Sequence, residues 1–208
     1  SGAVRVVDAL AVPEGQRGHD LGLGAPHELL RLVEGLEGSV EMVTELAPRP
    51  EYGLVRPLFR ATADGGRTFG GARLSVRAGV PSRVGDAAAL RASFTVSAGE
   101  RVGFAMRFAG PEDPAPEATD PARVAALLDD VAAAWRSWED EHDVYAGPHR
   151  DLVRLSARVL KGLTYRPTGA IVAAPTCSLP ETVGGERNWD YRYVWISDAS
   201  LTVGAIDI

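Results

Sequence analysis

Polar and hydrophobic positions alternate along the first half of the chain, and this pattern predicts β-strands. The alternation is cleanest at residues 40–46, where the residues on one side are Val40, Met42, Thr44 and Leu46. A period of two places one face of a strand on a hydrophobic core and the other face in water. Similar short segments predict strands at 5–12, 28–36, 73–76, 91–96 and 103–108. Strands at this spacing are typical of an antiparallel β-sandwich.

Turn-forming residues separate these expected strands. Glu37-Gly38-Ser39 predicts a hairpin between the strands 28–36 and 40–46, and Asp64-Gly65-Gly66 predicts another tight turn. Segment 28–36 also fits a helix, because four of its apolar residues recur at helical spacing: Leu29, Leu32, Val33 and Leu36. We interpret it as a strand, since Leu30-Arg31-Leu32 fits the strand period as well.

The second half of the chain has the helical period. Asp120 followed by Pro121 predicts the start of a helix, because Asp caps free backbone N–H groups and Pro fits the first turn. One face of this helix is apolar over four turns: Val124, Leu127, Leu128, Val131, Trp135 and Trp138. After Pro148 we expect a second helix whose apolar residues face inward: Leu152, Leu155, Val159, Leu160 and Leu163.

The order of these elements predicts an α+β fold. Residues 1–110 form a partial β-sandwich domain, and residues 111–119 form a linker that contains three prolines. Residues 120–208 form a helical part. Apolar runs stand at both ends of the chain, with no polar tail after Ile208. Since an apolar end needs a packing partner, we expect a fragment of a longer protein.

Composition narrows the classes of function. The 208 residues carry 22 basic and 28 acidic side chains, for a net charge of -6. An acidic chain of this kind does not predict nucleic-acid binding, and no apolar run is long enough to predict a membrane span. The acidic runs 129–130 and 139–143 are interpreted as a solvated face of the first helix.

Cysteine and histidine positions point away from metal chemistry. Cys177 is the only cysteine, so the chain has no internal disulfide and no cysteine-rich metal site. The four histidines show no ligand spacing and are expected at the surface. We therefore expect no metal and no cofactor. A reducing compartment is allowed, and we expect a cytoplasmic protein.

An aromatic segment near the C-terminus carries the candidate chemistry. Trp189, Tyr191, Tyr193 and Trp195 alternate with other residues, and a helix is expected from Ser197 or Asp198. Strand and helix periods both place Tyr191 and Trp195 on the same side. Two flat rings beside the Asp198 carboxylate suit a sugar, with the rings against its C–H face and the carboxylate on its hydroxyls. A buried aromatic cluster with Asp198 as a helix cap is the alternative.

Several strings in this region are similar to a known family. Tyr145-Ala-Gly-Pro148, Thr168-Gly-Ala-Ile-Val-Ala-Ala-Pro-Thr176, Ser178-Leu-Pro-Glu181 and Asn188-Trp-Asp-Tyr-Arg-Tyr193 resemble the family-15 glycoside hydrolases, a bacterial glucoamylase and trehalase-like group. The resemblance is strongest from about residue 135 to 202. It implies a β-sandwich, a linker helix and an (α/α)₆ barrel, of which this chain would hold part of the sandwich, the linker helix and the first barrel helices.

The resemblance also implies an activity for the parent protein. It would hydrolyse α-glucosidic bonds with inversion, through a general acid and a general base, both Glu. Such carboxyls stand roughly 6.5–9.5 Å apart, so that a water fits between them. We find no matching pair in this chain, and the family pattern places both Glu residues beyond Ile208. The fragment alone is therefore expected to be inactive, with the remainder of the parent chain as its partner.

Three residues of the chain match the family's substrate-binding positions. Tyr191, Trp195 and Asp198 would contact the glucose ring at the non-reducing end of an α-glucoside. The family usually has Arg before that Asp, and here the residue is Ser197. A serine is too short to hold sugar hydroxyls as a guanidinium does, so the parent either binds its substrate differently or has weakened activity. The alternative function is a non-catalytic structural or carbohydrate-binding sandwich module.

Overall fold

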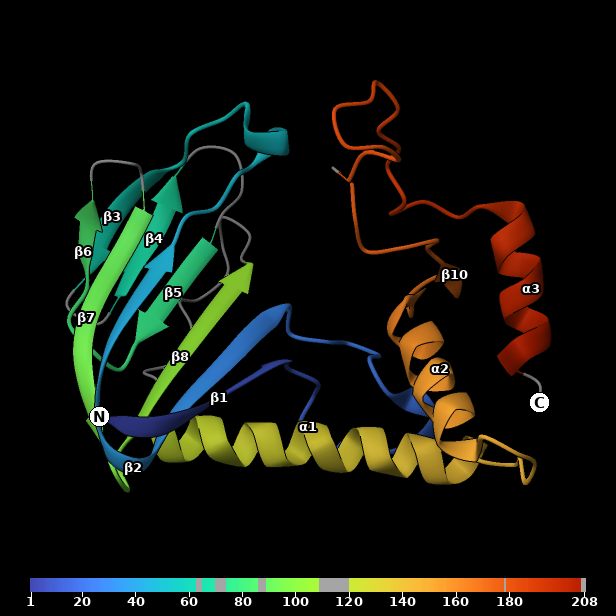
Figure 1. Cartoon of the computed structure of the whole chain (residues 1–208), viewed down its shortest axis with the longest axis horizontal. Coiled ribbons are helices and arrows are strands. Elements are labelled where there is room, and N and C mark those ends of the chain that lie inside the picture. Colours follow the sequence, from blue (N-terminus) through green and yellow to red (C-terminus); the bar gives the residue numbers. More distant parts are fainter. Residues whose placement is uncertain (63–64, 70–73, 86–88, 109–119, 178, 207–208) are drawn as a thin grey trace. The chain divides into compact units, whose positions relative to one another are not determined.

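The computed structural model of the chain describes residues 1–62, 65–69, 74–85, 89–108, 120–177 and 179–206 (Figure 1). The chain folds into two compact units, each described by itself below. The first comprises Ser1–Gln16 and Gly24–Ala134, and the second comprises Arg17–Leu23 and Trp135–Ile208. An antiparallel sheet precedes the helices, so the predicted α+β class is confirmed. The predicted domain limits stay a prediction, and the predicted linker 111–119 lies outside the described residues.

Antiparallel strands of the first unit form one curled sheet. Its order is β3-β4-β5-β8-β2-β7-β6, with β1 paired to β2. β3 also contacts β6 and β7 from the other end of this order, so the sheet folds back on itself as a sandwich does. The strand bounds are β1 Gly2–Leu10, β2 Glu28–Leu46, β3 Leu58–Thr62, β4 Gly65–Phe69, β5 Leu74–Ala78, β6 Arg83–Gly85, β7 Ala89–Ser97 and β8 Arg101–Phe108.

The predicted hairpin at Glu37-Gly38-Ser39 is wrong, because β2 continues through it. Residues 28–34 of β2 pair with β8, whereas residues 39–46 pair with β7. One strand thus passes from one part of the sheet to another, and the chain bends without reversing. Gly38, with φ +59°, supplies a conformation that other residues rarely adopt. The turn predicted at 64–66 falls where the chain reverses between the antiparallel strands β3 and β4, with Thr62 opposite Gly65. Gly65 and Gly66 already belong to β4, and Asp64 lies outside the described residues.

Gly35 allows the bent strand to meet the turn between β7 and β8. Its N–H donates to the Glu100 carbonyl, and its carbonyl accepts from the Gly99 N–H, both at 2.9 Å. A Cβ at this position would stand 1.9 Å from the Ser97 carbonyl oxygen. The backbone approach therefore requires glycine, and it fixes the point at which β2 bends.

Helix α1, Pro121–His142, begins in the first unit and packs on the sheet. The Asp120 side chain accepts from the Ala122 N–H at 3.0 Å, which confirms the predicted N-terminal cap. Val124 and Leu128 join buried strand residues in one core: Ala11, Leu30, Leu32 and Ala105. The period of the apolar face therefore predicted the packed side of α1 correctly.

The second unit is built from the end of α1 and from shorter elements. Helix α2 spans Arg150–Gly162, β9 spans Thr164–Tyr165, β10 spans Ala170–Ile171, and α3 spans Ile196–Ile206. Short 3-10 turns lie at Gly18–Asp20 and, in the first unit, at Glu51–Gly53. No helix among the described residues is long and apolar enough to cross a membrane.

The inward direction predicted for the apolar residues of α2 is wrong for three of them. Leu152 is 62% exposed, and Leu155 and Val159 are also exposed. α2 contacts α3 and β9, and only Leu160 and Leu163 are half-buried as predicted. Another face of α2 carries arginines that pair with Glu139 and Asp143 at the end of α1.

Candidate functional site

The aromatic segment predicted as a sugar wall is fixed by backbone hydrogen bonds. The Tyr191 N–H donates to the Thr176 carbonyl, and the Ala174 N–H donates to the Tyr191 carbonyl, both at 3.0 Å. The Ala173 N–H donates to the Tyr193 carbonyl at 3.1 Å. Two motifs that lie about 15 residues apart in the sequence are thus joined as neighbouring extended segments.

Tyr191 and Trp195 come together as a stacked pair. Their ring centroids are 5.6 Å apart and the planes differ by 15°. Trp195 directly precedes α3, and its carbonyl accepts from the Ala199 N–H at 2.8 Å. Trp195 stays 39% exposed. The pair therefore presents aromatic surface on the side of Trp195 that Tyr191 does not cover.

Asp198 lies in the first turn of α3, three residues after Trp195. A carboxylate is favoured there because free N–H groups and the helix dipole face it. The Ser197 hydroxyl donates to its Oδ2 at 3.0 Å. Asp198 also lines a cavity of about 270 Å³ between α2, β10 and α3, and it carries the only charge among the described lining residues.

The structure brings two of the three predicted site residues into direct contact. Tyr191 and Trp195 stack, whereas Asp198 lines a cavity that neither ring lines among the described residues. The cavity wall includes Ala173, whose N–H donates to the carbonyl of Tyr193 in the segment that also carries Tyr191. A role of all three in one sugar site stays a prediction.

A hairpin beside this segment brings Glu181 against Trp189, a contact that the sequence analysis had not predicted. Pro180 and Asn188 form an antiparallel bridge, and the Glu181 N–H donates to the Arg187 carbonyl at 3.1 Å. Across the hairpin, Nε1 of Trp189 donates to Oε1 of Glu181 at 2.8 Å. The Gly184-Gly185 pair, a turn signal midway between Glu181 and Trp189, could have indicated this pairing.

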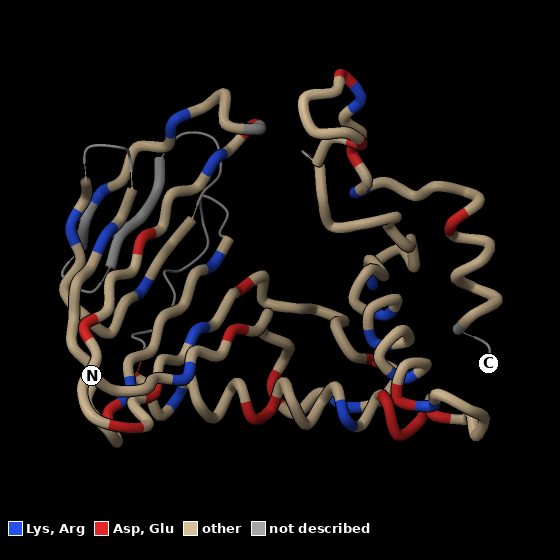
Figure 2. Tube along the Cα trace, viewed as in Figure 1, with Lys and Arg blue, Asp and Glu red and all other residues tan. Residues whose placement is uncertain are grey.

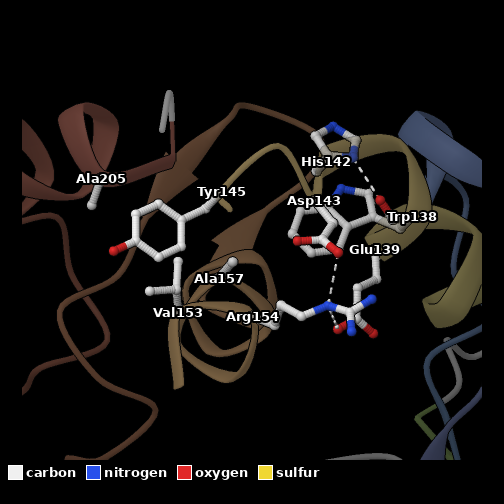
Figure 3. A pocket seen from close by; sticks show the side chains of 9 residues that line it. All are labelled: Trp138, Glu139, His142, Asp143, Tyr145, Val153, Arg154, Ala157 and Ala205. Atoms are coloured by element: carbon white, nitrogen blue, oxygen red, sulfur yellow. Dashed lines mark hydrogen bonds and ion pairs between the residues drawn. The ribbon is translucent and has the colours of Figure 1, made fainter. Parts of the chain in front are cut away.

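An ion-pair network joins the end of α1 to α2 (Figure 3). Nε of Arg154 stands 3.1 Å from Oε1 of Glu139 and 3.0 Å from Oδ2 of Asp143. Arg150 pairs with Asp143, and this pair raises the pKa of the Arg150 guanidinium. Figure 2 shows the acidic end of α1 and the basic residues along α2.

The interpretation of 139–143 as a solvated face is therefore wrong for Glu139 and Asp143, whose side chains are largely buried. The reason is their spacing. Glu139 and Asp143 are four residues apart, and Arg154 of α2 lies within ion-pair distance of both. Arg150 also pairs with Asp143. This network holds α2 against the end of α1.

Trp138 is the centre of an aromatic cluster at the end of α1. The His142 ring lies 4.6 Å from the Trp138 ring at 19°, and His19 lies 5.9 Å from His142. His142 Nδ1 is 2.7 Å from the Trp138 carbonyl, so that nitrogen is the donor. The surface position predicted for the histidines is wrong for His142, which is half-buried in this stack.

Lys161, the only lysine of the chain, stands over the other side of this cluster. Its Nζ is 5.9 Å from the Trp138 ring centroid. Burial lowers the pKa of its ammonium, the nearby Arg166 lowers it further, and Asp20 acts in the opposite direction. The fold thus disfavours the charged form relative to a lysine in water.

We expect the pKa of Lys161 to lie below the ordinary value for a lysine, which is about 10.4. The unfolded chain then binds more protons than the folded chain between the two pKa values, so the free energy of unfolding rises as the pH rises through that window. ¹³C-dimethylation of the single lysine and an NMR titration measure this pKa. The same titration in urea gives the reference, and equal values in both states would contradict the prediction.

No group of three or more His, Cys, Asp or Glu residues among those described could hold a metal ion.

Comparison with known proteins places the chain. Residues 147–207 match the family model of the glycosyl hydrolases family 15. A trehalase of Mycolicibacterium smegmatis is 36% identical over 190 residues, which cover 86% of this chain and 27% of the relative. A trehalase of Thermoplasma acidophilum is 49% identical over 79 residues, which cover 38% of this chain and 13% of the relative. Trehalase 2 of Sulfolobus acidocaldarius is 57% identical over 51 residues, which cover 24% of this chain and 9% of the relative.

Identity is highest where the alignments are confined to short segments, and the segment that matches the family model includes the whole of α3. That matched segment contains α2, the Glu181–Trp189 hairpin, the Tyr191–Trp195 stack and Asp198. The chain spans about a quarter of the length of the mycobacterial relatives. Through this segment, the chain belongs to family 15 of the glycosyl hydrolases.

Proposed function

We propose that this chain is part of a glycoside hydrolase that cleaves an α-glucosidic bond, with trehalose as its substrate. In this proposal Tyr191, Trp195 and Asp198 bind the glucose ring at the non-reducing end. The relatives that match the chain are trehalases, which supports the choice of substrate. The observation that carries the proposal is the stacked Tyr191–Trp195 pair, with a carboxylate in the helical turn that follows it.

The chemistry of a sugar fits this surface. A pyranose has an apolar C–H face that packs on an aromatic ring, and hydroxyl groups at its edge that donate to a carboxylate. Trp195 offers a partly exposed ring, and the exposed Asp198 carboxylate keeps Oδ1 for a ligand while Oδ2 accepts from Ser197. Charge-assisted hydrogen bonds of this kind are about twice as strong as neutral ones.

In this proposal, the groups that cleave the bond lie outside this chain. An inverting hydrolase needs one carboxylic acid on the leaving oxygen and one carboxylate that activates water on the opposite face. We propose that both are Glu residues of a longer protein. The exposed apolar face of α2 supports such a protein, because further helices of an (α/α)₆ barrel would cover Leu152, Leu155 and Val159.

Ser197 gives the site a property of its own. Its hydroxyl donates to Asp198 at 3.0 Å, so it acts on the carboxylate and does not reach outward as an arginine would. We propose that the site binds glucose through fewer direct contacts than family members with Arg at this position. Ser197→Arg in the longer protein would then lower KM for trehalose.

The test compares this 208-residue chain with the longer protein. Both are incubated with trehalose and with maltose, and NMR follows the anomers of the released glucose. We expect release only by the longer protein. Inverting attack on α,α-trehalose makes one β-glucose and frees one α-glucose, so the first product mixture should be equal in both anomers.

Three outcomes would contradict this proposal. Glucose release by the short chain would show that the catalytic acids are misplaced. An initial product that is entirely α-glucose would show retention. No release by the longer protein would remove the proposed activity, and would favour the alternative of a non-catalytic module.

A further inference from the structure

Trp189 stays 45% exposed although its indole is held in place. Its Nε1 donates to Oε1 of Glu181 at 2.8 Å, and Oε2 of Glu181 lies 3.9 Å from the Arg187 guanidinium. Both carboxylate oxygens therefore have partners on the same hairpin. The carboxylate is kept in one orientation, and the indole it holds presents a large part of its surface to solvent.

The hairpin that carries this pair is itself well bonded. The Glu181 N–H donates to the Arg187 carbonyl at 3.1 Å, and the Gly185 N–H donates to the Thr182 carbonyl at 2.8 Å. Figure 2 shows the charged residues gathered on this hairpin. Charged residues thus lie on the hairpin beside the exposed Val183, and the indole of Trp189 is the large aromatic side chain held there. Tryptophan is enriched at interfaces because its ring is apolar while its N–H finds a hydrogen-bond partner, and Trp189 has both properties.

Trp189 lies close to the stacked pair of Tyr191 and Trp195. It precedes Tyr191 by two residues, so their Cα atoms are at most about 7 Å apart. Tyr191 is anchored through its N–H to the Thr176 carbonyl. Because Tyr191 and Trp195 cover each other, each of them has one ring face left for a ligand. Trp189 adds a further exposed aromatic surface close to this pair, on which a second sugar ring can pack.

We propose that Trp189 contacts the leaving pyranose of a disaccharide, and that Glu181 positions Trp189 for this contact. This inference rests on the proposed function. It gives the aromatic segment two tasks. Tyr191, Trp195 and Asp198 bind the glucose at the non-reducing end, whose anomeric carbon is attacked, and Trp189 binds the leaving sugar. Trp189 is then a specificity-determining residue, and Glu181 acts only through it.

The experiment compares two substrates in the longer protein. Trehalose has a pyranose as its leaving group, whereas methyl α-glucoside has a single carbon there. Trp189→Ala should lower kcat/KM for trehalose about tenfold and for methyl α-glucoside less than twofold, which is the size of one stacking contact. Glu181→Ala should reproduce most of this loss. Glu181→Gln should retain activity, because its amide oxygen can still accept from the indole N–H.

Val183→Ala, at the almost fully exposed tip of the same hairpin, is the matched control and should change neither substrate. An equal loss on both substrates would show that Trp189 supports the fold, and no loss on either substrate would show that Trp189 does not contact the leaving sugar. Either result overturns the inference while cleavage of trehalose by the unchanged protein keeps the proposed function. If the unchanged protein cleaves neither substrate, the proposed function and this inference are both wrong.

Discussion

Replacing Asp198 with asparagine in the longer protein should lower kcat/KM for trehalose by about 10- to 100-fold. A hydrogen bond to a charged group contributes about 1.5–3 kcal/mol, and the proposed site uses this carboxylate to accept from sugar hydroxyls. Asparagine keeps the size of the side chain but removes the charge and adds donors that face the sugar hydroxyls. Steady-state kinetics with trehalose measure the loss.

The design needs a control that leaves the carboxylate in place. Ser197→Ala removes only the hydroxyl that donates to Oδ2 of Asp198, so its effect on kcat/KM should stay within about threefold. The unfolding midpoint of both variants should match that of the unchanged protein, because Asp198 and Ser197 are exposed. A loss below threefold for Asp198→Asn would place Asp198 outside the sugar site.

The local patterns predicted the elements better than their connections. The period of two identified β1, β7 and β8, and the cap at Asp120 marked the start of α1. Glu37-Gly38-Ser39 misled the prediction because a glycine with positive φ serves a bend in one strand as well as it serves a hairpin. Which of the two forms depends on β7 and β8, whose pairing with β2 is a long-range property.

In the candidate site, too, the sequence predicted a local arrangement but not the contacts between residues farther apart. Tyr191 and Trp195 were expected on the same side under either local period, and their stacking agrees with that expectation. The bond between Trp189 and Glu181 joins residues eight apart across a turn, and the partners of Glu139 and Asp143 come from another helix. Charge and polarity along the chain do not identify such pairs, since they depend on how the elements pack.

The second unit should depend strongly on Trp138. Trp138→Ala is expected to lower the free energy of unfolding by about 3–5 kcal/mol, the cost of truncating a buried tryptophan. Trp138 is 3% exposed and contacts His142 at 4.6 Å and Trp135 at 6.2 Å, measured between ring centroids. Its loss leaves a cavity between these rings and removes the ring face below Lys161.

Urea unfolding followed by the remaining tryptophans measures this loss. All four tryptophans of the chain (Trp135, Trp138, Trp189 and Trp195) lie in the second unit, so their fluorescence reports that unit. Trp138→Phe keeps an aromatic ring against His142 and should cost less than half as much as Trp138→Ala. Val183→Ala should stay within about 0.5 kcal/mol, because an exposed side chain loses few contacts. A cost below 1 kcal/mol for Trp138→Ala would contradict the prediction, because it would show that the aromatic cluster contributes little to the stability of the second unit.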